Sequence, residues 1–212
     1  MKKTFLVLAG LSLAVAAMAQ HPFTCTTEGA KLHYMTTDAK GNESSTSDVE
    51  ITKVVADGDS FSITQVTTVL INGTAFTKPI ETTSTVKDGD VMVDFSGGLS
   101  LATEGGGFAL PKRLAVGLEL PTGEVTVDVQ GLKVKQDISF HKVVAKEELT
   151  VPAGTYECYV IERQYTAKML GIKVKGSMKS WYARGIGIVK TETYDKKGKL
   201  QSSQILMSVE GI

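Results

Sequence analysis

The feature that most constrains this sequence is the regular spacing of its turn signals. Short segments in which apolar and polar residues alternate are separated by turns, of which Asp57-Gly58-Asp59, Asn72-Gly73 and Asp88-Gly89-Asp90 are the clearest. Asn-Gly and Asp-Gly pairs favour tight hairpin turns because both residues tolerate a positive φ. The segments between the turns show no clear 3.6-residue apolar period, which an amphipathic helix would need. The pattern therefore predicts antiparallel hairpins.

The rest of the chain is organised around residues 151–198, which we interpret as three consecutive antiparallel strands. A turn at Pro152 and Gly154 precedes a segment rich in Tyr, Val and Ile, whose apolar residues fall on both parities. Apolar residues on both parities predict a strand that is buried on both faces. Further along, Gly185 and Gly187 flank Ile186. We expect at least one of these glycines to have a positive φ or to pack against another backbone segment.

These patterns predict an all-β fold: a single antiparallel, strongly curved sheet or half-barrel with little helix. The turn count gives roughly nine to twelve strands. Residues 96–121 are irregular, since they contain two glycine runs and two prolines. We interpret this segment as a long crossover with one short helical turn, inside the domain rather than at a domain boundary.

Residues 1–19 have the composition of a secretory signal peptide. Lys2 and Lys3 precede an apolar run, and Ala17 and Ala19 form a small-residue cleavage site. The alternative is a buried N-terminal helix. We predict that residues 20–212 form a single β-rich domain, exported to the periplasm or the extracellular space. No cysteine directly follows the cleavage site, so we do not expect a lipid anchor.

The charge of the chain is balanced, with 23 Lys and Arg against 23 Asp and Glu. Dispersed and balanced charge argues against binding to nucleic acid and against electrostatic docking on a membrane surface. No segment after residue 19 approaches the roughly 20 apolar residues that a membrane-spanning helix needs. We therefore expect no nucleic-acid partner and no membrane span.

The two cysteines, Cys25 and Cys158, permit one disulfide in an exported protein. The alternative is a pair of separate buried thiols, because free cysteine is among the most buried residue types. The compartment favours the disulfide, whereas the apolar strand around Cys158 favours the thiols. The sequence leaves both alternatives open.

Candidate catalytic and metal-binding motifs are sparse. His21, His33 and His141 show no paired metal-ligand spacing. The Asp-Gly-Asp turns lack the further oxygen ligands of a calcium loop. We predict no catalytic residue, no metal and no cofactor. The alternative is a hydrolase built on His33 or His141, which would need a histidine within hydrogen-bond reach of a Ser or Asp in a cleft.

Three motifs, at residues 152–159, 181–190 and 192–200, resemble one family of bacterial proteins. Shorter matches occur at residues 32–34 and 110–117. Together they resemble the TapB-like family, a domain of unknown function in exported bacterial proteins. The resemblance implies an exported, β-rich, single-domain protein, and it implies no activity because none is established for the family. A looser similarity connects such domains with half-barrel lipoprotein carriers.

Residues 151–198 also contain an aromatic and Met-rich group, which is our candidate ligand surface. Its members are Tyr159, Tyr165, Met169, Leu170, Met178 and Tyr182. Methionine adapts to irregular apolar ligands, although the same group could form the core of a curved sheet. Successive strand residues point to opposite faces. We therefore expect Met178, Ser180 and Tyr182 to line the ligand face, with Trp181 on the other face.

These observations predict an exported, non-enzymatic protein that binds an apolar small molecule or a cell-envelope protein on a concave sheet face. The alternative is a structural or surface-assembly protein that acts through strand edges and protein contacts. A deep apolar cavity would favour the first function, and a filled core with exposed apolar edges would favour the second.

Overall fold

The computed structural model describes residues 21–76, 78–94, 102–103, 108–129, 132–169 and 172–212. The predicted signal peptide and Leu170 lie outside these residues. None of the described residues is in a helix. The helical turn expected within residues 96–121 is therefore not found in the described part of that segment.

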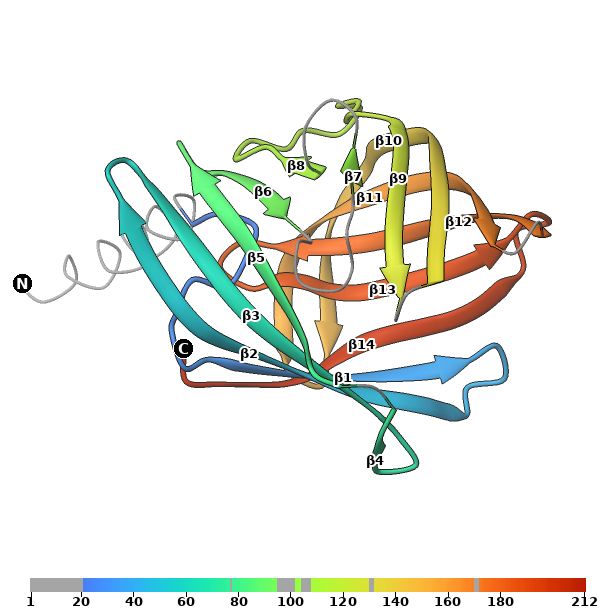
Figure 1. The fold of residues 1–212 in the computed structure, drawn as a ribbon, viewed down its shortest axis with the longest axis horizontal. Coiled ribbons are helices and arrows are strands. Elements are labelled where there is room, and N and C mark those ends of the chain that lie inside the picture. Colours follow the sequence, from blue (N-terminus) through green and yellow to red (C-terminus); the bar gives the residue numbers. More distant parts are fainter. Residues whose placement is uncertain (1–20, 77, 95–101, 104–107, 130–131, 170–171) are drawn as a thin grey trace, which may run out of the picture.

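The described residues form one antiparallel sheet of 14 strands (Figure 1). Its order is β7-β9-β10-β11-β12-β13-β14-β1-β2-β3-β5-β6-β8, with β4 paired to β3. The strands are β1 (Lys31–Asp38), β2 (Glu43–Asp57), β3 (Ser60–Ile71), β4 (Thr74–Ala75), β5 (Ile80–Lys87), β6 (Asp90–Asp94), β7 (Ala102–Thr103), β8 (Phe108–Leu110), β9 (Gly123–Val129), β10 (Leu132–Val151), β11 (Gly154–Met169), β12 (Ile172–Ala183), β13 (Gly187–Asp195) and β14 (Leu200–Glu210).

The pairing of β14 with β1 places the last and first strands side by side in the middle of the sheet. Residues 95–122 connect one side of the sheet to the other, because β8 pairs with β6 and β7 pairs with β9. Figure 1 shows the sheet bending strongly, with β2, β3 and β5 on one side and β9 to β12 on the other. The sheet does not close into a barrel. The predicted all-β, single curved antiparallel sheet is confirmed.

Register shifts interrupt several of the strand pairs and help to bend the sheet. They occur between Ile51 and Lys53 in β2, between Val143 and Ala145 in β10, and between Trp181 and Tyr182 in the β12–β13 pair. A bulge inserts one extra residue on one strand, which bends that strand and increases its local twist. The long strands β10 and β11 can therefore curve without losing their ladder.

The core is made of β-branched and other aliphatic side chains that alternate along the strands. The largest fully buried side chains come from β2, β3, β5, β10, β11, β13 and β14, and they are Ile51, Ile63, Val86, Val143, Cys158, Val189 and Leu206. Such side chains have high strand propensity because they pack well on a pleated surface. The core therefore runs across both sides of the curved sheet.

The segment before β1 is fixed to the turn between β12 and β13. Gly185 N donates a hydrogen bond to Pro22 O at 2.8 Å. A Cβ added to Gly187 would lie 3.6 Å from Thr24 Cα. Gly185 and Gly187 have φ values of 72° and 98°. The expectation for this glycine pair is thus confirmed. Both glycines have a positive φ, and Gly187 also packs against another backbone segment.

We expect Gly187→Val to lower the free energy of unfolding by about 2 kcal/mol, because valine is strained at this φ and its methyl groups would meet the segment before β1. Gly198→Val is the matched control. Gly198 has a φ of 77°, but nothing lies within 4 Å of an added Cβ. The control should therefore show only the conformational strain, about 1 kcal/mol. Urea unfolding of both variants checks the difference, and equal losses would mean that the contact with residues 23–24 is unimportant.

Candidate functional site

The strand register places four of the six predicted ligand-surface residues on one face of β11 and β12. Tyr159 is paired with Tyr182, Arg163 with Met178, and Tyr165 with Gly176. Paired residues share a face, and residues two apart on a strand share it too. We call this face, which carries Tyr159, Arg163, Tyr165, Met178 and Tyr182, the tyrosine face.

The two tyrosines at one end of this face pack against the hydrophobic core. Tyr159 is half-buried and meets Phe23 edge-to-face, with 5.6 Å between the ring centroids. Tyr182 also packs against the core, and burial raises its phenol pKa. Both side chains therefore contribute to the core, yet each is only half-buried and remains part of the tyrosine face. Of the other predicted residues, Met169 ends β11, and Leu170 lies outside the described residues.

At the other end of the tyrosine face, Met178 and Tyr165 are half-buried and are not part of the core cluster. The Nη2 of Arg163 donates to Met178 Sδ at 3.0 Å. The Tyr165 ring covers Gly176, where an added Cβ would lie 2.9 Å from Tyr165 Oη. This end of the face combines an aromatic ring, a thioether and a guanidinium.

A stripe of small polar side chains continues the tyrosine face toward the middle of the sheet. Ser180 Oγ lies 3.4 Å from Thr191 Oγ1, and Gln204 Nε2 donates to Ser47 Oγ at 3.5 Å. Ser180 and Ser47 are both only 7% exposed. Buried strand positions are normally apolar. The hydroxyl and amide groups of this stripe therefore mark an unusual part of the interior.

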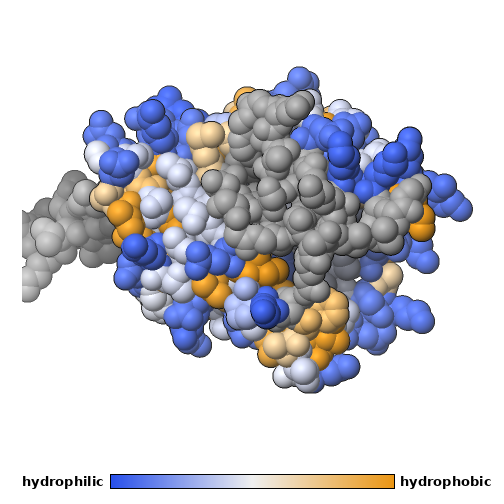
Figure 2. Space-filling view, in the orientation of Figure 1, coloured by the Kyte–Doolittle hydropathy of each residue, from blue (hydrophilic) through white to orange (hydrophobic). Residues whose placement is uncertain are grey.

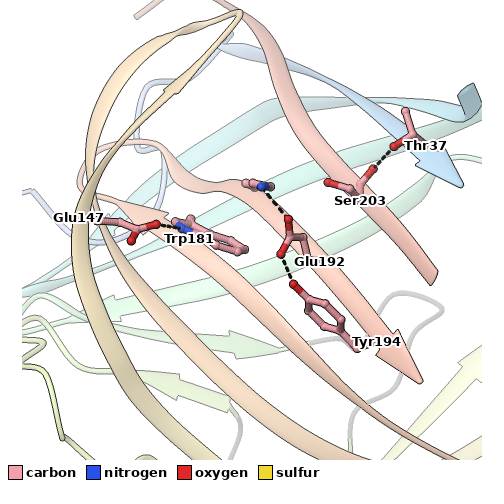
Figure 3. Close-up of polar contacts among 7 residues, drawn as sticks. Thr37, Glu147, Trp181, Glu192, Tyr194 and Ser203 are labelled. Atoms are coloured by element: carbon pink, nitrogen blue, oxygen red, sulfur yellow. Dashed lines mark hydrogen bonds and ion pairs between the residues drawn. The ribbon is translucent and has the colours of Figure 1, made fainter. Parts of the chain in front are cut away.

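The opposite face of β12 carries an aromatic and ionic network around Trp181 (Figure 3). Trp181 Nε1 donates to Glu147 Oε1 of β10 at 2.7 Å, and Lys190 Nζ lies 4.8 Å from the Trp181 ring centroid. Lys190 also pairs with Glu192 at 2.7 Å, and Tyr194 donates to the other oxygen of Glu192. We call this face the tryptophan face. Trp181 and Tyr182 point to opposite faces, as predicted.

The network on the tryptophan face fixes the charges of its members. Burial alone would raise the pKa of Glu192, but the hydrogen bonds from Lys190 and Tyr194 outweigh burial and hold that pKa below its ordinary value. Burial and the Glu192 carboxylate raise the pKa of Tyr194 to about 12. At neutral pH, Glu192 is therefore ionised and Tyr194 remains a neutral donor.

We expect Glu147→Ala to lower the free energy of unfolding by about 1–2 kcal/mol, because it leaves the buried indole N–H of Trp181 without its acceptor. Glu147→Gln keeps an acceptor oxygen and should restore most of the loss. Glu148→Ala, at the exposed neighbouring position, is the control. Unfolding followed by the fluorescence of the sole tryptophan measures all three, and equal stability of the three variants would contradict the hydrogen bond.

A groove of about 420 Å³ also lies on the tryptophan face, across β14, β1, β2 and β3. Its lining mixes charged residues such as Lys31 and Glu50 with apolar ones such as Val66 and Leu70. Within it, His33 Nδ1 lies 2.5 Å from Asp48 Oδ1, and Ser208 is the cross-strand neighbour of His33 on the other side. Because its lining is mixed, this groove is not the deep apolar cavity expected of a carrier.

The Ser208, His33 and Asp48 row has the residue types of a nucleophile, a base and a carboxylate. It thus meets the geometric condition set for the hydrolase alternative. The backbone N–H groups of β1 are used in its ladders with β14 and β2, so donors for an oxyanion would have to come from another strand. The side chains of His33 and Asp48 are exposed, and we interpret their contact as a surface hydrogen bond.

Both cysteines are free thiols, and both are buried. This is the second of the two alternatives that the sequence left open. Burial raises the pKa of both thiols, and for Cys158 the nearby carboxylates Glu147 and Glu157 raise it further, to about 12. His141 is 3% exposed, and its Nδ1 donates to Pro121 O at 2.9 Å.

The part of the chain that the structure describes contains no group of three or more His, Cys, Asp or Glu that could hold a metal ion. The same residues contain no helix that is long and apolar enough to cross a membrane.

Sequence reasoning missed Arg163, the polar stripe and the pair of His33 and Asp48. Arg163 has Ile161 and Tyr165 as its neighbours two positions away in the sequence, and a charge at that parity was a visible signal. His33 and Asp48 are separated by 15 residues. Only the register of β1 with β2 brings them together, so no spacing rule could have found them.

The sequence matches the family described as DUF3108-like over residues 27–206. The match does not confirm the TapB-like resemblance by name. Two solved structures have the same fold. One is described as a candidate exported protein with a YmcC-like fold from Bacteroides fragilis, at 16% identity and a TM-score of 0.78, covering 90% of this chain and 100% of that one.

The other is described as a candidate lipoprotein from Parabacteroides distasonis, at 20% identity and a TM-score of 0.77, covering 90% of this chain and 99% of that one. At these identities the two structures show the fold alone. A search of curated proteins gives no match.

Proposed function

We propose a binding function for this chain, which belongs to the DUF3108-like family: it is an exported, non-enzymatic protein that holds an apolar small molecule on its tyrosine face. Export is supported by the composition of residues 1–19 and by the descriptions of the two structural neighbours. Cell fractionation distinguishes a periplasmic from an extracellular location after export.

The observation that carries this proposal is the composition of the tyrosine face. Tyr165 and Met178 are half-buried outside the core cluster, and the neighbouring stripe has the hydroxyl groups of Ser180 and Ser47 at buried strand positions. A close-packed core would place large aliphatic side chains there. Ligand sites typically combine an apolar lining with a few polar groups that orient the ligand, and this face has that composition.

Native mass spectrometry of the protein purified from the producing cell tests the proposal. We expect a subpopulation with an added mass in the range of a small lipid, which is lost after extraction with organic solvent. A single species at the mass of the polypeptide, with no binding of a neutral apolar probe such as N-phenylnaphthylamine, would contradict the binding function.

A structural or assembly function is the second candidate, favoured by exposed apolar residues at the tips of two hairpins. Ile172 and Val174 at the start of β12 are 65% and 53% exposed, and Phe76 beyond β4 is 66% exposed. Figure 2 shows hydrophobic patches among hydrophilic residues, one of them at the lower edge, where Figure 1 places β4. Analytical ultracentrifugation distinguishes this assembly function from the binding function. Concentration-dependent self-association that is lost in Ile172→Lys would support assembly.

A further inference from the structure

Arg163 lies on the tyrosine face without a carboxylate partner among the described residues. Its Nη2 donates to the sulfur of Met178 at 3.0 Å, and its Nε is buried without a hydrogen-bond partner in the part of the chain that the structure describes. A thioether is a weak acceptor, whereas a guanidinium has five N–H donors and stays charged at every physiological pH. The hydrogen bonds of Arg163 thus include no strong acceptor.

The groups around Arg163 are neutral. His141 is its cross-strand neighbour on β10, and burial lowers the pKa of His141, with a further contribution from the charge of Arg163. Burial keeps the phenol of Tyr182 protonated. The adjacent carboxylate, Glu162, points to the tryptophan face and pairs with Lys179 at 3.8 Å. The charge of Arg163 is therefore not balanced by these neighbours.

A partly buried guanidinium without a counter-charge destabilises a fold, because the charge has lost hydration and gained no strong partner. Methionine or leucine at this position would extend the apolar strand without that cost. The position of Arg163 is explained if its acidic partner is a ligand rather than a residue of the chain.

We propose that Arg163 binds the acid group of an amphipathic ligand, whose apolar chain lies along Tyr165, Met178 and Tyr182. This inference rests on the proposed binding function and names the ligand class: one carboxylate or phosphate monoanion on an apolar chain. The N–H groups on Nε and Nη of a guanidinium form a fork that matches two oxygens of one acid group. A single positive charge among neutral groups selects a single negative charge.

Binding of three probes to delipidated protein by isothermal titration calorimetry tests the inference. The probes are palmitate, hexadecyl phosphate and hexadecanol, which share one alkyl chain and differ in the head group. We expect wild type to bind at least one of the two acids about ten- to a hundredfold more tightly than the alcohol, the range expected for a charge-assisted hydrogen bond. The two acids separate a fatty-acid-like ligand from a phosphate-bearing one.

Arg163→Met should remove the preference for the acid while leaving the binding of hexadecanol within about twofold of wild type. Lys179→Met is the matched control, since it removes a cation from the neighbouring strand on the tryptophan face, and it should retain the preference. The melting temperature of ligand-free Arg163→Met should equal or exceed that of wild type, whereas a merely structural arginine would give a lower one.

The outcomes separate the two proposals. If no probe binds to wild type, the binding function itself fails. If wild type binds the acids and the alcohol equally, or if Arg163→Met keeps the preference for an acid, the inference about Arg163 is overturned while the binding function stands.

Discussion

Gly176→Ala is expected to lower the free energy of unfolding by about 3 kcal/mol, a cost at the upper end of that for overpacked sites. Gly176 has no positive φ, so backbone strain is not the cause. An added Cβ would lie 2.5 Å from the carbonyl oxygen of Tyr194 and 2.9 Å from Tyr165 Oη. The carbonyl belongs to β13, which pairs with β12 at this position. It cannot move away without disturbing that ladder.

Two further variants locate the origin of the loss. Lys175→Ala, at the exposed neighbouring position, should change the stability by less than about 0.5 kcal/mol. Tyr165→Phe removes the hydroxyl contact but leaves the backbone contact, so Gly176→Ala should remain strongly destabilising in that background. Calorimetric melting of wild type, the three single variants and the Tyr165→Phe/Gly176→Ala double variant makes the comparison. A Gly176→Ala variant with the melting temperature of wild type would refute the close approach of β12 and β13.

In the folded protein, Cys158 should react with iodoacetamide at pH 8 about a thousandfold more slowly than an exposed cysteine. The thiolate is the nucleophile, and about a quarter of an ordinary thiol with a pKa near 8.5 is ionised at that pH. Burial, followed by the charges of Glu147 and Glu157, raises the pKa of Cys158 to about 12. A raised pKa disfavours the thiolate, so ionisation and reactivity both fall, and burial blocks access as well.

Mass spectrometry after labelling in strong denaturant without a reductant completes this experiment. Free thiols predict two labels per chain, one on Cys25 and one on Cys158, against almost none on the folded protein. Zero labels in denaturant would mean that the cysteines form the disulfide after all. Rapid labelling of Cys158 in the folded protein would instead contradict its burial.

The parts of this fold that could be predicted from sequence are those decided by neighbouring residues. The turn at Asn72-Gly73 has φ values of 51° and 73°, and that at Asp88-Gly89 has 54° and 86°, as their residue types require. The separation of Trp181 from Tyr182 follows from the alternation of a strand. The fold class followed because turns and alternation recur along nearly the whole chain.

The parts that could not be predicted depend on pairings between distant segments. Glu147 and Trp181 are separated by 34 residues, and β11 lies between their strands. Their contact therefore depends on the curvature of the sheet as well as on its order. Alternation along β11 places Arg163 on the same face as Tyr159 and Tyr165, but only the register between β11 and β12 pairs it with Met178. A shift of one residue in that register would have changed the partners of the whole group.

Titration with N-phenylnaphthylamine tests the central claim, that the tyrosine face binds an apolar ligand, most directly. Wild type should show saturable fluorescence enhancement. Met178→Ala and Tyr182→Ala should each weaken binding about fivefold or more. Each substitution removes apolar contact area that contributes roughly 1 kcal/mol to the binding free energy. Gln164→Ala and Trp181→Ala, which alter the tryptophan face, should weaken it less. No saturable binding, or an equal loss in all four variants, would contradict the claim.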